Sequence, residues 1–298
     1  MKIKIGDLEL KNPFMPASGT FGYGLEYSDF GDLSRLGALV TKGVSLTPRK
    51  GNKPPRICEV SGGMLNSIGL ENIGLEEFKT LLCDLKDIDT AIVVNFFGNT
   101  FEEYIELAAQ LSKQPKVTAL EMNISCPNIK QGGICFGTDE NTVQHLVSEV
   151  KKVSEKPLWV KLTPNTGDIT TIAVAAEKGG ADAVVVANTY LGMAVDIKQK
   201  KPKLANIYGG FSGPAIKPLT MYNVFRCVKV LTIPVIACGG VTALNDAIEY
   251  LIVGAKAIQV GTANFTNPAI LWELIEKLKE YLAAENLSID DLIGSLKV

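Results

Sequence analysis

Cys126 is the residue whose type and position most directly suggest chemistry in this chain. It lies in the segment Asn123-Ile124-Ser125-Cys126-Pro127-Asn128, just after a predicted buried strand, and Gly132-Gly133 follows on the same loop. A thiol inside a strand would merely pack, whereas a thiol on a glycine-hinged loop over a pocket can transfer a proton. Cys135 lies on the same loop, but between two apolar residues, which favours packing. We therefore expect Cys126 to be the catalytic group.

Histidine and metal chemistry are not expected, so acid–base work must fall to Cys, Lys, Asp, Glu or Tyr. The chain has one histidine, His145, and six cysteines without any Cys-x-x-Cys pair. His145 lies off the apolar face of the helix predicted over 142–153, so we expect no histidine triad or dyad. Zinc sites and iron–sulfur clusters need closely spaced thiolates, so we expect no metal in this chain.

Polar residues stand where several predicted strands end. A single asparagine there could be only a strand-end cap, and a lysine could extend into solvent. The two lysines, however, follow apolar runs, and three carboxamides at one mouth offer donors and acceptors together. They predict a flat heteroaromatic ligand bound near positioned ammonium groups. The residues are Lys42, Gly43, Asn95, Asn123, Lys161, Asn188 and Thr189.

Two glycine turns follow the last two predicted strands. They are Gly239-Gly240 and Gly261-Thr262. Barrels commonly bind a phosphate at these turns through backbone N–H groups and a helix N-terminus, and glycine permits close approach. Either pair alone could be a simple turn, but the two together predict a phosphate site.

The elements that position these residues follow an α/β pattern along the whole chain. Strands are predicted over 38–41, 56–60, 91–95, 118–123, 158–162, 183–188, 235–238 and 257–260. Helices are predicted over 76–85, 101–111, 142–153, 169–178, 218–228, 244–252 and 268–282, the last with Asn267 as N-cap and Pro268 at its first position. Eight strands alternating with helices predict a (β/α)8 TIM barrel, whose active site forms at the C-terminal strand ends.

The remaining chain fits one barrel domain over residues 1–298. Residues 3–10 read as an N-terminal hairpin that closes the bottom of the barrel. Two long loops, 127–140 and 190–214, are expected to lie over the C-terminal face, because long loops in compact domains are usually functional.

Composition excludes several classes of protein. The 30 basic and 32 acidic residues among 298 are nearly balanced, which argues against nucleic-acid binding. No apolar run is long enough to span a bilayer, and the first residues lack the pattern of a signal peptide. We expect a cytoplasmic protein.

Several motifs are spread over nearly the whole chain. They are Pro16-Ala17-Ser18-Gly19, Asn66-Ser67-Ile68-Gly69-Leu70, the segment 123–128, Gly132-Gly133-x-x-Phe136-Gly137, Asn188-Thr189 and Gly209-Gly210-x-Ser212-Gly213-Pro214-Ala215. In these motifs and in their order the chain resembles a known family, the class 1 dihydroorotate dehydrogenases, which use FMN in pyrimidine synthesis. The Gly-Gly-x-x-Phe-Gly continuation of the cysteine loop resembles the class 1B catalytic subunit, which works with an NAD-linked partner.

The resemblance implies a role for each matching residue. Contacts to FMN are implied for Ser18, Lys42, Gly43, Asn95, Asn123, Lys161, Ala187, Gly213, Gly239, Gly240, Gly261 and Thr262, the last four at the phosphate. Contacts to dihydroorotate or orotate are implied for Lys42, Asn66, Ser67, Ile68, Gly69, Leu70, Asn123, Asn188 and Thr189.

The resemblance also implies a mechanism and partners. Cys126 removes the C5 proton, C6 gives a hydride to the flavin, and Lys161 stabilises the charge that grows there. A homodimer is implied, joined by a subunit that carries FAD and a [2Fe-2S] cluster in a heterotetramer. One departure is Asn95-Phe96-Phe97, where smaller residues are expected, and it puts the local packing in doubt.

Three other interpretations remain open from the sequence. A dihydropyrimidine dehydrogenase-like reductase would share the phosphate turns and Lys161, and would differ in the loops around Asn66 and Cys126. An aldolase or lyase barrel would use Lys161 for a Schiff base, without a flavin. A non-catalytic assembly subunit would leave the polar strand ends unexplained.

Overall fold

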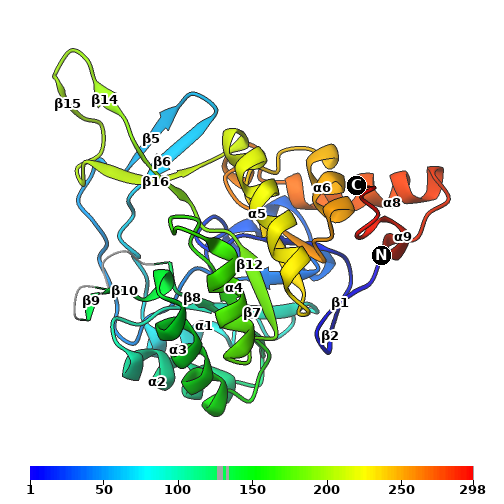
Figure 1. Ribbon diagram of the computed structural model, residues 1–298, viewed down its shortest axis with the longest axis horizontal. Helices are drawn as coiled ribbons and strands as arrows, with labels where there is room; N and C mark the ends of the chain where they lie inside the picture. Colours follow the sequence, from blue (N-terminus) through cyan, green and yellow to red (C-terminus); the bar gives the residue numbers. More distant parts are fainter. Residues whose placement is uncertain (126–129, 132–133, 298) are drawn as a thin grey trace.

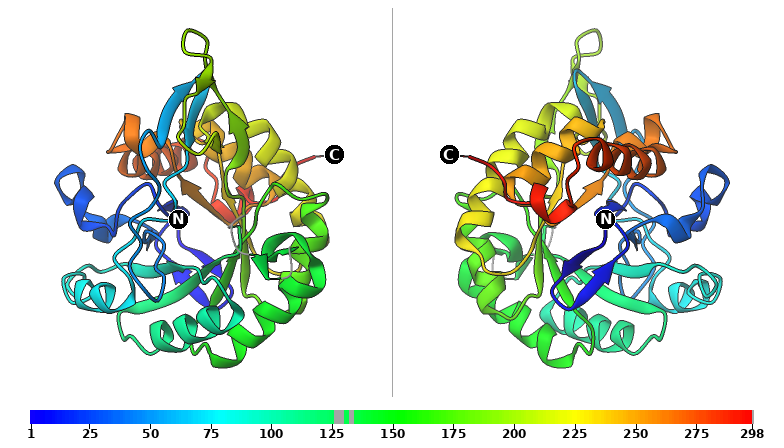
Figure 2. Two further views of the ribbon diagram at one scale, coloured as in Figure 1. Left: turned by 90° about the vertical axis from the view of Figure 1, so that its left-hand side faces the viewer. Right: turned by 90° about the vertical axis from the view of Figure 1, so that its right-hand side faces the viewer.

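A curled sheet of parallel strands forms the centre of the molecule (Figures 1 and 2). The computed structural model describes residues 1–125, 130–131 and 134–297. Within these residues the sheet has eight strands, and the N–H of Gly37 donates to the carbonyl of Phe14 at 2.9 Å, which links its two edges. The strand order is β3 (Phe14–Pro16), β18 (Ala257–Val260), β17 (Val235–Cys238), β12 (Ala183–Val186), β11 (Leu158–Lys161), β8 (Val117–Asn123), β7 (Ala91–Phe96) and β4 (Ala38–Val40). The predicted TIM-barrel class is confirmed.

Helices cover the outside of this barrel (Figure 2), so the strands are buried on both faces. Several helices begin at a side-chain cap: Thr100, Asp139 and Asp168 each accept a hydrogen bond from the first turn. The helices are α1 (Leu75–Leu81), α2 (Phe101–Ser112), α3 (Glu140–Val153), α4 (Ile169–Lys178), α5 (Lys217–Val230), α6 (Leu244–Val253), α7 (Ala263–Thr266), α8 (Ile270–Ala284) and α9 (Ile289–Leu292). Short 3₁₀ helices occur at η1 (Leu25–Phe30), η2 (Leu33–Arg35), η3 (Phe136–Thr138) and η4 (Pro214–Ile216).

One predicted barrel strand is wrong. Residues 56–60 contribute β5 (Ile57–Val60), which pairs antiparallel with β6 (Gly63–Asn66) outside the barrel. Side chains along β5 alternate between exposed and partly buried, the pattern of a ribbon with one solvated face. The missing barrel strand is β3, whose three residues are all buried, and which is too short to give a periodic signal.

The predicted start of the last long helix is also wrong. α8 begins at Ile270 with Ala269 as its N-cap residue, two residues later than predicted. The Oδ1 of Asn267 accepts a hydrogen bond from the N–H of Ala269 at 3.2 Å. Asn267 therefore closes a local Asx turn ahead of the helix and does not cap the helix itself.

Excursions from the barrel lie at its two ends. At the C-terminal end, β13 (Tyr190–Met193), β16 (Tyr208–Ser212), β6 and β5 form an antiparallel sheet, with the hairpin of β14 (Val195–Asp196) and β15 (Lys201–Pro202) at its tip (Figure 1). The loop after β8 contains β9 (Lys130–Gln131) and β10 (Ile134–Cys135). The predicted N-terminal hairpin, β1 (Ile3–Ile5) and β2 (Leu8–Leu10), is present, and its turn at Gly6 lies near Asp182 at the start of β12.

No helix among the described residues is long and apolar enough to cross a membrane.

Candidate functional site

A cavity of about 910 Å³ opens at the carboxyl ends of the barrel strands, under the antiparallel sheet. Parallel strands direct their final side chains to this edge, so residues far apart in the sequence line one space. The predicted phosphate and ring-binding residues all line it: Ser18, Lys42, Gly43, Asn95, Asn123, Lys161, Ala187, Gly213, Gly239, Gly240, Gly261 and Thr262. The residues predicted for the substrate line it too: Asn66, Ser67, Ile68, Gly69, Leu70, Asn188 and Thr189.

Cys126, the predicted catalytic residue, lies outside the described residues. Its neighbour Ser125 does line the cavity, and the Ser125 hydroxyl donates to the carbonyl of Lys161 at 3.2 Å. The N–H of Ser125 also donates to Oδ1 of Asn123 at 3.1 Å. The chain that leads to Cys126 is thus fixed at the cavity wall by two hydrogen bonds.

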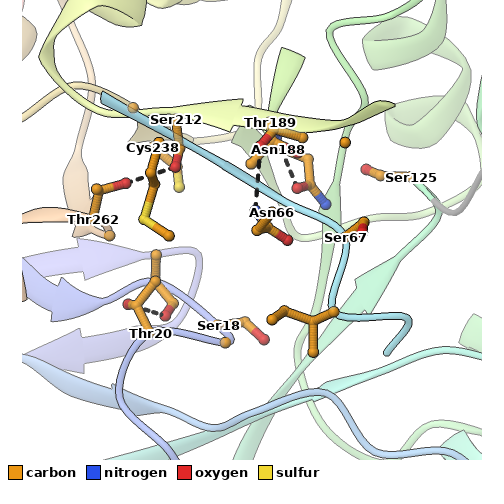
Figure 3. A pocket seen from close by; sticks show the side chains of 18 of the residues that line it. Ser18, Thr20, Asn66, Ser67, Ser125, Asn188, Thr189, Ser212, Cys238 and Thr262 are labelled. Carbon is orange, nitrogen blue, oxygen red and sulfur yellow. Dashed lines mark hydrogen bonds between the residues drawn. The ribbon is translucent and has the colours of Figure 1, made fainter. Parts of the chain in front are cut away.

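One side of the cavity carries asparagine side chains that are held by hydrogen bonds, among them Asn66 and Asn188 (Figure 3). Asn188 Nδ2 lies 3.4 Å from Asn123 Oδ1, and Asn188 Oδ1 accepts from the N–H of Thr189 at 2.8 Å. Asn66 Nδ2 donates to the carbonyl of Gly210 at 3.4 Å and so joins β6 to β16. These contacts orient carboxamides that can bind a small polar ring from its edge.

Asn165 supports the same side and was not predicted. Its Nδ2 donates to the carbonyl of Thr189, and its Oδ1 accepts from the N–H of Leu191, both at 2.9 Å. This clamp fixes the backbone on either side of Tyr190, where the chain leaves β12 for β13. The Thr163-Pro164-Asn165 turn directly after β11 was a readable signal for it.

The opposite side is formed by glycine turns (Figure 3 shows Ser212 and Thr262 there). The Thr262 hydroxyl donates to Ser212 Oγ at 2.7 Å, which joins the end of β18 to β16. Gly240 has a φ of +73°, and a Cβ there would lie 2.6 Å from the backbone nitrogen of Lys217. Only glycine fits this turn without strain, which leaves backbone along the cavity wall without side chains.

Asp246 holds the chain between the Gly239-Gly240 turn and α6. Its Oδ2 accepts from the N–H groups of Thr242 and Ala243, each at 2.9 Å, and Oδ1 accepts from Lys217 at 2.6 Å. Ala243 is the N-cap residue of α6, so Asp246 fixes the turn that leads into the helix.

A buried polar group forms the floor of the cavity. Lys161 Nζ donates to Oε1 of Gln259 at 2.9 Å and lies 3.7 Å from Oε1 of Glu121. Burial opposes the charge of Lys161, but the carboxylate of Glu121 beside it favours that charge, and the pKa of the lysine is raised. Burial raises the pKa of the Cys238 thiol. The contacts to Gln259 and Glu121 hold the Lys161 side chain in one position at the floor of the cavity.

Glu121 and Gln259 are functional candidates that the sequence reasoning missed. Both are fully buried, in the middle of β8 and β18. A charged or amide side chain inside an otherwise apolar strand is a readable signal, because burial without a partner is unfavourable. Glu121 and Gln259 were not predicted because only residues at strand ends were considered.

Phe96 and Phe97, the departure from the expected motif, are both fully buried. Phe97 lines the cavity, and the guanidinium of Arg49 lies 5.1 Å from its ring centroid. Gly43 makes room for this ring, because a Cβ at Gly43 would lie 3.1 Å from it and 2.8 Å from Asn95 Oδ1. The large rings therefore fit without displacing Asn95.

Comparison with known proteins agrees with this geometry. A family model described as dihydroorotate dehydrogenase matches residues 1–282. Three relatives carry the name dihydroorotate dehydrogenase B (NAD(+)), catalytic subunit. The protein of Geotalea daltonii is 48% identical over 100% of this chain and 98% of its own length. That of Trichlorobacter lovleyi is 49% identical over 100% and 98%, and that of Carboxydothermus hydrogenoformans 50% identical over 99% and 96%. With a family model over nearly all of the sequence and relatives about half identical over their full length, the chain belongs to the dihydroorotate dehydrogenase family.

Proposed function

We propose that this chain oxidises (S)-dihydroorotate to orotate with bound FMN, in de novo synthesis of UMP, and passes the electrons through a partner subunit to NAD+. One observation carries the proposal. A single cavity gathers every described residue that the sequence assigned to flavin or substrate. The names of the three relatives support the same reaction and the same acceptor.

The residues of the cavity suit FMN. At one end, Gly213, Gly239 and Gly240 line the cavity with a positive φ that disfavours any side chain, so the wall there is bare backbone, which suits a phosphate. On the floor, the buried Oδ1 of Asn95 has no hydrogen-bond partner among the described residues, and it suits a ring N–H. Lys161 adds a fixed positive charge at the same floor. FMN, when bound, supplies a two-electron acceptor for the hydride from C6.

The chain's own residues would do the rest. Asn123, Asn188 and Thr189 orient the substrate ring by its edges, and Lys42 binds the carboxylate. Cys126, which directly follows Ser125 of the cavity wall in the sequence, accepts the C5 proton. Lys161 holds its proton and stabilises negative charge in front of it, an effect that is large in a site closed to water.

A second protein would complete the electron path. The printed names of the relatives describe a catalytic subunit, which implies another subunit. Among the described residues, no group of three or more His, Cys, Asp or Glu could hold a metal ion. We propose a homodimer of this chain, joined in a cytoplasmic heterotetramer by a subunit with FAD and a [2Fe-2S] cluster.

The test is anaerobic mixing of the purified chain with dihydroorotate, followed by visible spectroscopy. We expect a yellow protein whose flavin absorbance bleaches on mixing and returns when an electron acceptor is added. Bleaching by dihydrouracil, but not by dihydroorotate, would favour a dihydropyrimidine dehydrogenase-like reductase. A colourless chain that binds no FMN and is trapped by borohydride with a carbonyl substrate would favour a Schiff-base aldolase. Copurification from the native host tests the partner, because FAD and iron–sulfur absorption would accompany it.

A further inference from the structure

Four polar side chains meet inside the barrel at the floor of the cavity, which two of them line. They are Asn95, Glu121, Lys161 and Gln259, from β7, β8, β11 and β18, and all are buried. Glu121, with no exposed surface, is the only carboxylate of this group. None of the roles proposed above for flavin or substrate falls on Glu121, so its presence needs another explanation.

The hydrogen bonds of Glu121 connect the group. Its Oε1 accepts from Asn95 Nδ2 at 2.7 Å, and its Oε2 accepts from Gln259 Nε2. Lys161 donates to Oε1 of the same Gln259 and lies 3.7 Å from Oε1 of Glu121. Asn95 and Lys161 therefore both approach one oxygen of Glu121 and must be neighbours.

This arrangement fixes which atom of each amide faces the ligand. An ionised carboxylate can only accept, so Asn95 and Gln259 must each turn an N–H toward it. Asn95 is then left with Oδ1 on the other side, beside Gly43 and without a hydrogen-bond partner among the described residues. Gln259 is left with Oε1 toward Lys161, where it holds the ammonium. A buried carboxylate also balances the lysine charge, which alone would be unfavourable in the barrel.

We propose that Glu121 is a positioning residue that sets the hydrogen-bond polarity of the cavity floor, with an acceptor at Asn95 next to a cation at Lys161. Such a pair selects a ring edge that carries an N–H beside an electron-rich oxygen or nitrogen. The inference rests on the proposed function, in which that edge belongs to the flavin ring of FMN.

Glu121→Gln is the first test, with FMN affinity of the apoprotein measured by quenching of flavin fluorescence. A glutamine offers one acceptor and one donor, so it cannot satisfy the N–H groups of both Asn95 and Gln259. One of the two amides must therefore turn. If Asn95 turns, its Oδ1 no longer faces the ring; if Gln259 turns, its Oε1 no longer accepts from Lys161. We expect FMN to bind at least about tenfold more weakly, the scale of one lost hydrogen bond to a charged or buried group.

The double variant Asn95→Asp with Glu121→Gln restores the polarity. The introduced glutamine can then donate to the introduced aspartate and accept from Gln259, while that aspartate still presents an acceptor beside Gly43. We expect the FMN affinity of the double variant to return to within about tenfold of the wild type, because the floor again offers an acceptor next to a cation. If Glu121→Gln does not fold, this double variant still decides: a folded double variant that does not bind FMN would overturn the proposal.

Asn12→Ala is the matched control for stability. Asn12 is buried two residues before β3 and does not line the cavity; its side chain donates to the carbonyl of Arg35 and accepts from the N–H of Phe14. We expect this variant to be less stable but to bind FMN as the wild type does. Unchanged FMN affinity in Glu121→Gln, or a weakening that the double variant does not rescue, refutes the role of Glu121. A wild-type chain that binds no FMN at all would instead refute the proposed function.

Discussion

Lys161 reaches from β11 across the barrel interior to β18, where its Nζ donates a 2.9 Å hydrogen bond to Oε1 of Gln259. The two strands are not neighbours in the sheet, so this bond spans the barrel below the cavity. The same ammonium lies 3.7 Å from the buried Glu121 and is its ion-pair partner. Lys161 therefore gives the cavity a positive charge and is also part of the packed interior of the barrel.

We expect Lys161→Met to destabilise the protein even without FMN. The change leaves the buried Glu121 carboxyl group without its ion-pair partner, and breaking a buried pair in this way costs about 3–5 kcal/mol. The combined change with Glu121→Gln should recover much of that loss, because no uncompensated charge remains. Urea unfolding of the wild-type, Lys161→Met and Lys161→Met/Glu121→Gln apoproteins measures the loss of stability and its recovery. A single variant within about 1 kcal/mol of the wild type would contradict the pairing, since typical surface substitutions have no larger effect.

A second prediction concerns Cys126. Replacement by alanine should slow reduction of the flavin by dihydroorotate about 10²–10⁴-fold, the usual contribution of a general base, while FMN stays bound. In the wild type the rate should rise with pH, because a thiol with an ordinary pKa near ~8.5 is mostly protonated at neutral pH. Stopped-flow absorbance measures both. Cys135→Ala, on the same loop, is the control and should reduce at the wild-type rate; equal rates in the two variants would remove Cys126 from the mechanism.

The sequence was sufficient for most of the barrel because its strands are continuous apolar runs between glycines and polar turns, as in β12. It was insufficient for β3, since three residues carry no period, and for residues 56–60, where strand propensity does not distinguish a barrel strand from a ribbon. The site followed from the rule that carboxyl ends of parallel strands converge. Contacts below that edge, such as Asn95 with Glu121, depend on the stagger of neighbouring strands, which the sequence alone does not supply.

A third prediction separates the glycines needed for folding from those needed for binding. Gly240→Ala places a Cβ 2.6 Å from the Lys217 backbone at a φ of +73°, so it should lower the stability of the apoprotein by at least about 1–2 kcal/mol. Gly261→Ala meets nothing closer than the Cβ of Ala17 at 3.5 Å, so the apoprotein should keep its stability.

Gly261 lines the cavity, as Gly240 does, and its added methyl group should weaken FMN binding about tenfold or more by hindering close approach of the phosphate. Thermal unfolding of the apoproteins and FMN titration test the pair. Wild-type FMN affinity in Gly261→Ala would place the phosphate elsewhere in the cavity.

A fourth prediction concerns Asp246, which holds the turn between β17 and α6. Burial opposes its ionisation, but hydrogen bonds from Lys217 and from Thr242 and Ala243 outweigh burial and lower the pKa of Asp246. Because the folded pKa lies below the unfolded value, this carboxylate stabilises the fold above about pH 4, near the ordinary pKa of aspartate, and the stabilisation is lost as pH falls through the folded pKa. Asp246→Asn should thus cost about 1–2 kcal/mol at pH 7, the scale of a lost helix-start contact, and progressively less as the pH falls below about 4.

Asp89 provides the contrast, because its pKa is also lowered, by a hydrogen bond from Lys11, yet its side chain is almost wholly exposed. An exposed pair is screened by solvent, so Asp89→Asn should leave the unfolding free energy unchanged at every pH. Urea unfolding of both variants across this pH range separates the two cases. If Asp246→Asn were as stable as the wild type at pH 7, Lys217 and the backbone N–H groups would not depend on the charge of Asp246. The glycine turn beside it would then keep its shape through Gly240 and its neighbours alone.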